Sequence, residues 1–466
     1  MRVSRRTCLT GLAGAAGCAA LSRFASAQLK PTQATDLTIQ TAQAEILPGT
    51  MTDGLISTSM DRPPPVLQMN QGQVFRSRVT NTLPDYTAMH WHGIRVPNGM
   101  DGVPYLTQIP FGQDEAFDYE FTPEDAGTYW YHPHCMTMDQ MALGLTGVLT
   151  VAEAEDPGYD ADIAFNLRDF RLNGDGEFIE LWTARGAARA GTKGTVVTAN
   201  WRVDAREEAP AGGLVRVRLA ATDTARIYKV FVPDAEGAVI ALDGHPLQQL
   251  RALPLTEDGA LVLSPGQRAD LVIKMPEDEG RVVDIMNAMP GGPRRIAHMR
   301  STGAPRQRST SEIVPLAPNP LSEPDLSNAR LENFVFGWSP DGLEPNNGLC
   351  GTLGYTFWSI NRTPWAGDAA EGTGPLASFR LGESVVLRLQ NESPNAHPIH
   401  LHGLTFRVLR SNMRAVSRHW TDTALLLKGE TLEIAFVADN PGDWAFHCHV
   451  IEHQKTGLAG YISVLA

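Results

Sequence analysis

Several features that would assign a chain of 466 residues to a common class are scarce here. Only three cysteines, Cys135, Cys350 and Cys448, follow residue 27, so the chain is not a small disulfide-stapled scaffold. No run of about 18 apolar residues follows the N-terminal segment, so we predict no membrane-spanning helix in the mature protein. Acidic residues outnumber basic ones, and the formal net charge of −13 argues against binding to nucleic acid or an anionic membrane.

The first 27 residues have the features of an export signal. Arg5 and Arg6 precede an apolar run at 9–21, and the small residues at 25–27 offer a cleavage site. Paired arginines before a weakly hydrophobic core resemble a twin-arginine signal. We therefore expect residues 1–27 to be a twin-arginine-type signal peptide, read by the twin-arginine export machinery, and the mature protein to be periplasmic. Cleavage would remove four arginines and change the net charge from −13 to −17.

Helical periodicity is nearly absent after this segment. Short runs rich in β-branched and other apolar residues recur between turns that contain glycine or proline, which is typical of stacked β-sandwich domains. Runs of this kind lie at 74–79, 214–219, 260–263, 269–274 and 384–389.

The first and last thirds of the chain resemble each other. FTPEDAGTYWYHPH (121–134) aligns without gaps on FVADNPGDWAFHCH (436–449), and NTLPDYTAMHWHG (81–93) aligns on NESPNAHPIHLHG (391–403). The offsets of 315 and 310 residues are nearly equal, which indicates that one domain type is duplicated.

The middle third has the same alternation of strands and turns but no cluster of histidines. We interpret it as a third copy without a metal site. The predicted domains are 36–153, 160–290 and 331–466, and the segment at 291–330, rich in proline, arginine and serine, is the predicted linker.

Ten of the 13 histidines lie in four short clusters. Because alternate residues of a strand share a face, each His-x-His pair presents two imidazoles side by side. Neutral imidazole suits Zn, Cu, Fe or Ni, and one added thiolate favours Cu or Zn. The clusters are His90 and His92; His132 and His134; His397, His400 and His402; and His447, His449 and His453.

Strand parity divides these side chains between two locations. Cys448 points away from its neighbours His447 and His449, and His397 and His453 are predicted to join it. Two imidazoles and one thiolate are the trigonal ligand set of a blue-copper electron-transfer centre. The other eight imidazoles are too many for one ion and suit about three ions.

The motifs HWHG, YHPH, HPIHLHG and HCHVIEHQKTGL together resemble the four copper signatures of the multicopper oxidases, in the family's order. The resemblance spans nearly all of the chain after residue 27. It implies an all-β fold of three cupredoxin-like Greek-key β-sandwich domains and four copper ions. The implied ligands are His397, Cys448 and His453 for type 1; His90 and His400 for type 2; and His92, His132, His134, His402, His447 and His449 for the type 3 pair, with the trinuclear site between domains 1 and 3.

The resemblance also implies an oxidase that couples four one-electron oxidations to the reduction of O₂ to water. Cys448 would carry electrons from the type 1 site to the trinuclear site through its own backbone. We expect a monomer whose partners are O₂ and small reducing substrates.

The choice of reducing substrate depends on a missing insertion. Cuprous-oxidase relatives carry a Met-rich insertion before HPIHLHG, whereas residues 365–395 contain no methionine. We therefore expect laccase-like oxidation of phenols and aromatic amines, with oxidation of Cu(I), Fe(II) or Mn(II) in copper tolerance as the alternative. A non-catalytic copper-holding or scaffold relative is a further alternative, disfavoured because no ligand is missing.

Three residues near the motifs bear on how the site would work, and two of them, Leu458 and Gln454, depart from the family's pattern. Leu458 occupies the axial position, where many relatives have methionine, so we expect a three-coordinate and more oxidising type 1 site. Gln454 stands where related bacterial enzymes have an acid, which puts a second proton relay in doubt. Asp101 aligns with a family acid beside the trinuclear site and is the candidate proton relay, with a solvated turn aspartate as the alternative.

Cys135 directly follows His134. It could form a disulfide with Cys350 that ties the first domain to the last, as relatives do elsewhere. A buried free thiol is an equally supported alternative.

Overall fold

The computed structural model describes residues 33–340, 348–365, 367 and 374–466. Residues Thr32–Ala466 form one compact unit. The expected signal peptide, residues 1–27, lies outside the described residues, so the export route and the periplasmic location stay predictions. Among the helices of the described ranges, none has the length and apolarity needed to cross a membrane.

The first third contains two sheets that share one apolar core. In β5 the residues Phe75, Ser77 and Val79 are buried and those between them are not, which is the alternation of a strand with one face on a core. The larger sheet has the order β1 (Gln33–Ala34), β5 (Phe75–Asn81), β2 (Leu37–Leu47), β3 (Thr50–Ser57), with β7 (Ala116–Phe121) paired to β5; the smaller has the order β4 (Leu67–Asn70), β9 (Gly147–Ala152), β8 (Gly127–Pro133), β6 (Met89–His92).

The middle third repeats this plan with its own core. Apolar side chains of both its sheets, among them Leu219, Leu271 and Ile285, form one buried cluster. The six-stranded sheet has the order β11 (Val196–Ala199), β10 (Ala161–Phe170), β13 (Leu214–Ala221), β18 (Arg268–Lys274), β15 (Glu236–Leu242), β16 (His245–Ala252); the five-stranded sheet has the order β12 (Ala205–Pro210), β20 (Arg294–Thr302), β19 (Val282–Asn287), β14 (Tyr228–Phe231), β17 (Leu261–Leu263).

The last third follows the same order of strands as the middle third. Its core cluster again draws on both sheets, with Leu387 from one and Trp444 from the other. The sheets have the orders β22 (Trp358–Ile360), β21 (Arg330–Trp338), β24 (Ser384–Asn391), β29 (Thr431–Val437), β26 (Phe406–Ser411), β27 (Trp420–Thr421), and β23 (Ala377–Arg380), β31 (Ala459–Leu465), β30 (Gly442–Cys448), β25 (His397–Leu401), β28 (Thr423–Leu426).

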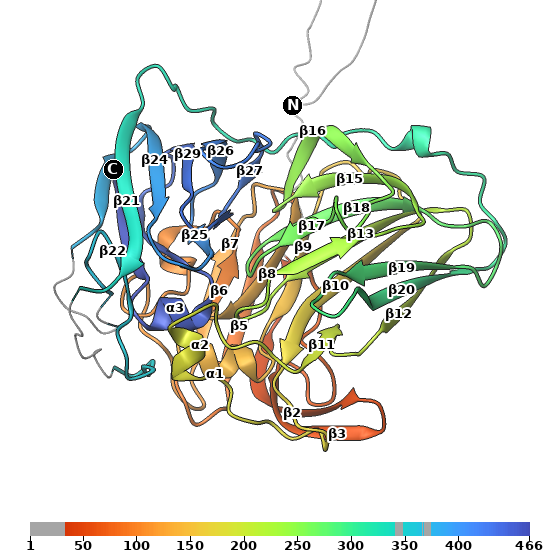
Figure 1. Cartoon of the computed structure of the whole chain (residues 1–466), viewed down its shortest axis with the longest axis horizontal. Coiled ribbons are helices and arrows are strands. Elements are labelled where there is room, and N and C mark those ends of the chain that lie inside the picture. The colour runs from red at the N-terminus through yellow and green to blue at the C-terminus, as the bar shows by residue number, and fades with distance from the viewer. Residues whose placement is uncertain (1–32, 341–347, 366, 368–373) are drawn as a thin grey trace, which may run out of the picture. The chain divides into compact units, whose positions relative to one another are not determined.

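These sheets confirm the all-β prediction. In each third an early long strand runs parallel to a later one: β2 to β5, β10 to β13, and β21 to β24. The α-helices of the described residues are short, and α3 contacts the other two (Figure 1): α1 (Thr137–Ala142), α2 (Ala184–Ala187) and α3 (Ile451–Lys455). The division into domains at the predicted boundaries stays a prediction.

One part of the predicted linker at 291–330 is wrong. Residues Arg294–Thr302 form β20, which pairs with β19 and β12 in the middle sheet. The strand carries three arginines and one histidine, but Ile296, Ala297 and Met299 are buried on its inner face. The polar residues concealed this alternation.

Cys135 and Cys350 form a disulfide, 215 residues apart in sequence, and Cys448 is a buried free thiol. Of the two alternatives for Cys135, a disulfide or a buried free thiol, the structure has the disulfide. It ties the end of the first third, next to His134, to the last third.

A chain that begins at residue 28 should show one thiol under denaturing, non-reducing conditions and three after reduction, because only Cys448 is unpaired. A colorimetric thiol titration measures both values. The Cys448→Ser variant is the control and should show none before reduction. Two or more free thiols in the unreduced wild-type chain would contradict the disulfide.

Candidate metal centres

Eight histidines lie on four strands or in the residue that directly follows one of them. β6 and β8 come from the first third, and β25 and β30 come from the last. His90 lies directly opposite His132 in the β6–β8 pair, and His400 lies opposite His447 in the β25–β30 pair. These eight side chains are buried, so the group lies inside the protein between the two similar thirds: His90, His92, His132, His134, His400, His402, His447 and His449.

The ring nitrogens of this eight-histidine group gather in three sets. Within each set the nitrogens lie within 4.8 Å of one another. The sets are His90, His92 and His400; His92, His132 and His449; and His134, His402 and His447. The last two sets divide into triads the six residues that the resemblance assigned jointly to the type 3 pair.

Several of these buried nitrogens have no hydrogen-bond partner among the described residues. They are Nε2 of His90, His132 and His400, Nδ1 of His92 and His134, and both nitrogens of His449. Unpartnered buried polar atoms are costly and call for a ligand. In His90, His132 and His400 the opposite nitrogen is bonded to a backbone oxygen, and in His92 it is bonded to a carboxylate, as a metal-binding imidazole requires. The donor set therefore fits bound metal ions.

The protonation state of these imidazoles also fits metal binding. Burial is the main cause that lowers the pKa of each shifted histidine, and neighbouring imidazoles lower most of them further. The pKa of His447 falls to about 3. Neutral imidazole is the form that coordinates a metal.

Asp101 lies directly beside the eight-histidine group and is completely buried. His402 Nδ1 donates to its Oδ2 at 2.9 Å, and His90 Nδ1 donates to its backbone oxygen at 2.7 Å. One aspartate thereby orients a histidine from each of the similar thirds. The solvated-turn alternative is wrong, because no part of Asp101 reaches solvent; its role as a proton relay stays a prediction.

The residue after Asp101 must be glycine. Gly102 has φ +83°, and a Cβ atom at this position would lie 1.9 Å from the backbone oxygen of Met89 in β6. Only glycine permits this close approach, which holds the Asp101 turn against the strand that carries His90.

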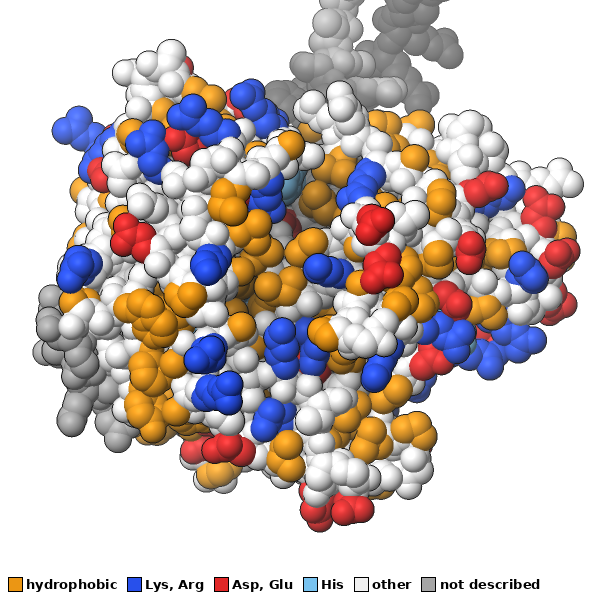
Figure 2. Space-filling view, viewed as in Figure 1, with side chains coloured by type: hydrophobic (Ala, Val, Ile, Leu, Met, Phe, Trp, Pro, Cys, Tyr) orange, Lys and Arg blue, Asp and Glu red, His pale blue; other side chains and the backbone are white. Residues whose placement is uncertain are grey.

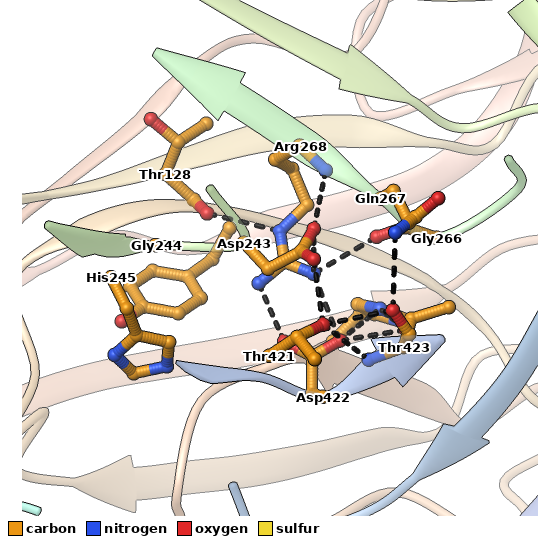
Figure 3. Close-up of polar contacts among 12 residues, drawn as sticks. Thr128, Asp243, Gly244, His245, Gly266, Gln267, Arg268, Thr421, Asp422 and Thr423 are labelled. Carbon is orange, nitrogen blue, oxygen red and sulfur yellow. Dashed lines mark hydrogen bonds and ion pairs between the residues drawn. The ribbon is translucent and has the colours of Figure 1, made fainter. Parts of the chain in front are cut away.

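Asp422 is a second buried acid at the group, and the sequence analysis missed it. His92 Nε2 donates to its Oδ1 at 3.0 Å, and His400 Nδ1 donates to its backbone oxygen at 2.9 Å. It lies between β27 and β28 (Figure 3). Its only signal in the sequence is an aspartate between two threonines in a β-rich run.

Asp422 is held by an arginine from the middle third. Arg268, at the start of β18, is completely buried, and its Nη2 lies 2.6 Å from Asp422 Oδ2 (Figure 3). Its backbone N–H donates to Asp243 Oδ1 at 2.7 Å, and Asp243 Oδ2 accepts a bond of 2.6 Å from Thr421. The middle third holds none of the donor sets found among the described residues, yet it fixes the orientation of two histidines.

The two carboxylates that share Arg268 titrate differently. Burial alone would raise the pKa of Asp422, but the charge of Arg268 and the bonds to His92 and His400 hold it well below its usual value. Burial, aided by the negative charge of Asp422, raises the pKa of Asp243 to about 7. The charge of Arg268 lowers the pKa of both carboxyl groups, but only at Asp422 is the effect of burial outweighed.

A cavity of about 230 Å³ reaches this network. It is lined by Asp243, Arg268 and Thr423 and by residues of the last third, His419 among them. Figure 2 shows a recess in the upper part of the surface with histidine atoms visible inside it. The cavity brings the outside of the protein close to the buried Arg268–Asp422 pair.

The second location holds Cys448, His397 and His453. Cys448 Sγ lies 3.5 Å from Nδ1 of each histidine, and the two Nδ1 atoms are 3.0 Å apart. The opposite nitrogens are bonded, His397 Nε2 to Ser393 Oγ and His453 Nε2 to the Arg189 backbone oxygen, both at 2.6 Å. Both Nδ1 atoms and the sulfur therefore converge on one point, as a trigonal copper site requires.

The two departures from the family's pattern both lie at these sites. Leu458 is buried in the same apolar cluster as Cys448, and its backbone oxygen accepts a bond of 3.0 Å from the Cys448 N–H. Gln454 lies in α3, and its Nε2 is 3.3 Å from His134 Nε2. An amide cannot ionise, so this position beside the eight-histidine group holds no titrating acid.

A Cys–His₂ set one residue away from a buried group of eight histidines, on sheets of this kind, defines a copper protein of the cupredoxin-like class. Residues 38–156 and 351–465 each match a family model described as multicopper oxidase. The chain belongs to the multicopper oxidase family, whose members are oxidoreductases that use copper and O₂.

Individual relatives resemble the chain over most of its length. Multicopper oxidase MmcO of Mycobacterium tuberculosis is 30% identical over 439 residues, which cover 85% of this chain and 80% of that protein. Laccase-4 of Trametes villosa is 25% identical over 478 residues, 91% of this chain and 88% of that protein. The crystal structure of a multi-copper oxidase from Pseudomonas thermotolerans has 36% identity and a TM-score of 0.83, and the match covers 93% of this chain and 99% of that one.

The Arg268→Met variant should lose about 3–5 kcal/mol of folding free energy, because it leaves two buried carboxylates without their cation. Urea unfolding of the copper-free protein measures the loss. The control is Arg295→Met, which breaks ion pairs to Asp204 and Asp284 at the surface and should cost less than about 1 kcal/mol. Equal losses would contradict the role of Arg268.

Asp243 should make stability depend on pH. The pKa of an unfolded aspartate is about 4, whereas that of Asp243 in the folded state is about 7. The folded state therefore binds more protons between these values, and this residue lowers stability as pH rises through that window. Relative to wild type, Asp243→Asn should become steadily more stable from about pH 4 to about pH 7 in urea unfolding; parallel curves would refute this.

Proposed function

We propose that the protein is a laccase-like multicopper oxidase that couples four one-electron oxidations of phenolic or aromatic amine substrates to the reduction of O₂ to water. The observation that carries the proposal is the position of Cys448 in β30. Its side chain belongs to the mononuclear donor set, while its neighbours His447 and His449 belong to the eight-histidine group.

Four copper ions are assigned to these donors. The mononuclear type 1 ion would be held by His397, Cys448 and His453; the type 2 ion by His90 and His400; and the type 3 pair by the triads His92, His132, His449 and His134, His402, His447. Bound copper supplies the one-electron redox chemistry and the site at which O₂ is reduced.

Cys448 connects the two locations by the shortest route that a chain allows. Its peptide neighbours are the histidines of two different triads. His447 Nδ1 also donates a bond of 3.0 Å to the Cys448 backbone oxygen. Electrons therefore have two covalent routes and one hydrogen-bonded route from the sulfur to the histidines.

Two acids lie at the eight-histidine group, and we assign orientation of a histidine to Asp422 and proton supply to Asp101. Asp422 is fixed by Arg268 and orients His92. Asp101 is the proposed proton relay, because its carboxylate lies within 3.2 Å of His90 Nδ1 and carries no such arginine partner in the described chain. Gln454 takes no part in proton supply.

Two observations support phenols rather than a metal ion as the reducing substrate. The residues before His397 contain no methionine back to residue 365. Met138 and Met141 lie in a buried apolar cluster with Trp130 and Ile451, which supports packing rather than a thioether site.

The copper-loaded protein should be blue, contain four copper ions and consume O₂ with 2,6-dimethoxyphenol. The Cys448→Ser variant should lose the blue absorption and oxygen uptake, because the sulfur supplies both the colour and the link between sites. Metal analysis, visible spectra and an oxygen electrode measure these properties. Faster turnover with Cu(I), Fe(II) or Mn(II) than with any phenol would overturn the substrate class, and a blue protein without oxygen uptake would overturn the oxidase.

The Leu458→Met variant should lower the midpoint potential of the blue site, because a thioether adds an axial donor that leucine lacks. Redox titration followed at the blue absorption band measures the change. Leu458→Ile keeps the position apolar and should leave the potential near the wild-type value. An unchanged or higher potential in the methionine variant would refute the argument.

A further inference from the structure

We propose that Trp338 and Trp358 form an electron-transfer relay from the protein surface to the mononuclear site of Cys448, His397 and His453. The inference deepens the proposed function and rests on it, since it names the place at which the reducing substrate delivers its electron.

The histidines of the mononuclear site offer no open edge to a substrate. His397 and His453 are completely buried, and their outer Nε2 atoms are bonded to Ser393 and to the Arg189 backbone. A substrate therefore cannot touch either imidazole while the protein has this conformation.

The segment that covers His453 is anchored at several points. It includes α2 and the residues up to Thr192. Trp358 Nε1 donates to the Ala187 backbone oxygen at 2.7 Å, and Thr192 Oγ1 donates to Glu452 Oε1 at 2.6 Å. Glu452 is one residue before His453, so the cover is fixed to the helix that carries this ligand. These hydrogen bonds hold the segment in place over His453.

Two stacked indole rings lead from the protein surface to the buried histidines. Trp338 in β21 lies directly opposite Trp358 in β22. Figure 1 shows these two strands beside each other in the last third. Their ring centres are 4.3 Å apart and the rings are tilted by only 13°. Trp358 is fully buried, and its ring centre lies 4.7 Å from that of His453 and 5.2 Å from that of His397. Trp338 is 47% exposed.

This contact sequence matters because electron tunnelling slows exponentially with distance and is slowest across empty gaps. From Trp338 to the imidazoles each step is a van der Waals contact between π systems. Ordinary core packing would explain a buried Trp358, but not its simultaneous contact with both histidines and with a solvent-exposed indole.

A phenol stacked on Trp338 is oxidised by one electron; its O–H bond breaks, the proton passes to bulk water, and a phenoxyl radical leaves. With copper bound by Cys448, His397 and His453, one Cu(II) ion would take up this electron and become Cu(I). Both indoles end unchanged. Because the donor stays at the surface, bulky phenols and aromatic amines are substrates as well as small ones.

Two more aromatic side chains, Tyr355 and Phe357, lie in the segment that leads into β22. Tyr355 is exposed and stacks on Phe357, with ring centres 5.2 Å apart and 12° between the planes. The Ser339 N–H donates to the Phe357 backbone oxygen at 2.8 Å, which fixes this pair next to the strand end that carries Trp338.

The test separates the reductive step from the rest of turnover. Under anaerobic conditions, 2,6-dimethoxyphenol is mixed with the copper-loaded protein and the loss of blue absorption is followed by stopped flow. Trp338→Leu should slow this loss about tenfold or more, while Trp338→Phe, which keeps a ring, should slow it less than about threefold. Leu331→Ala, which trims another exposed apolar residue of β21, is the control and should react at the wild-type rate.

Two further measurements exclude a merely structural effect. The midpoint potential and blue spectrum of Trp338→Leu should equal those of wild type. In the copper-free protein, quenching of tryptophan fluorescence by the phenol should be present in wild type and lost in Trp338→Leu. Because the indoles act in series, Trp358→Leu combined with Trp338→Leu should be no slower than the slower single variant.

The outcomes distinguish failure of the relay from failure of the proposed function. Wild-type reduction rates in Trp338→Leu, or a slower rate that follows a changed midpoint potential, would overturn the relay. The oxidase assignment would then stand as long as the wild-type protein is blue and consumes O₂. A wild-type protein that does neither would overturn the proposed function itself.

Discussion

Successive side chains of a β-strand point to opposite faces, and in β30 this alternation creates both metal centres at once. Cys448 faces His397 and His453, whereas His447 and His449 face the other six histidines. The register of β30 with β25 then fixes the partners, because His400 lies opposite His447. A shift of one residue would turn the thiol towards the eight-histidine group and two imidazoles towards the core. The whole site depends on this register.

The middle third has no donor set in the described structure, yet it completes both centres. At one end Arg268 neutralises Asp422, which holds His92 and His400. At the other the segment after α2 closes over His453 through the Arg189 backbone. The middle third is therefore more than a spacer, because it supplies a buried cation and a cover.

The sequence predicted the fold class and the grouping of histidines, because both follow from local patterns in short strands. It predicted the repeat because two pairs of segments align at nearly equal offsets. It did not predict Asp422 and Arg268, which lie 154 residues apart in regions without a motif. Their pairing depends on how two thirds of the chain meet, and no local period records that. The same reason explains β20: its polar residues resemble a linker until the neighbouring strands are known. The contact of the Arg189 segment with His453 could not be predicted either, because the two lie far apart in the sequence.

The eight-histidine group takes four members from the first third and four from the last, and each of its two triads mixes the two. Neither similar third can hold even one complete triad alone. A fragment lacking either end would retain half the imidazoles and no complete triad. Both triads therefore form only when the first and last thirds of the chain are folded against each other, so the site for oxygen chemistry is either complete or absent.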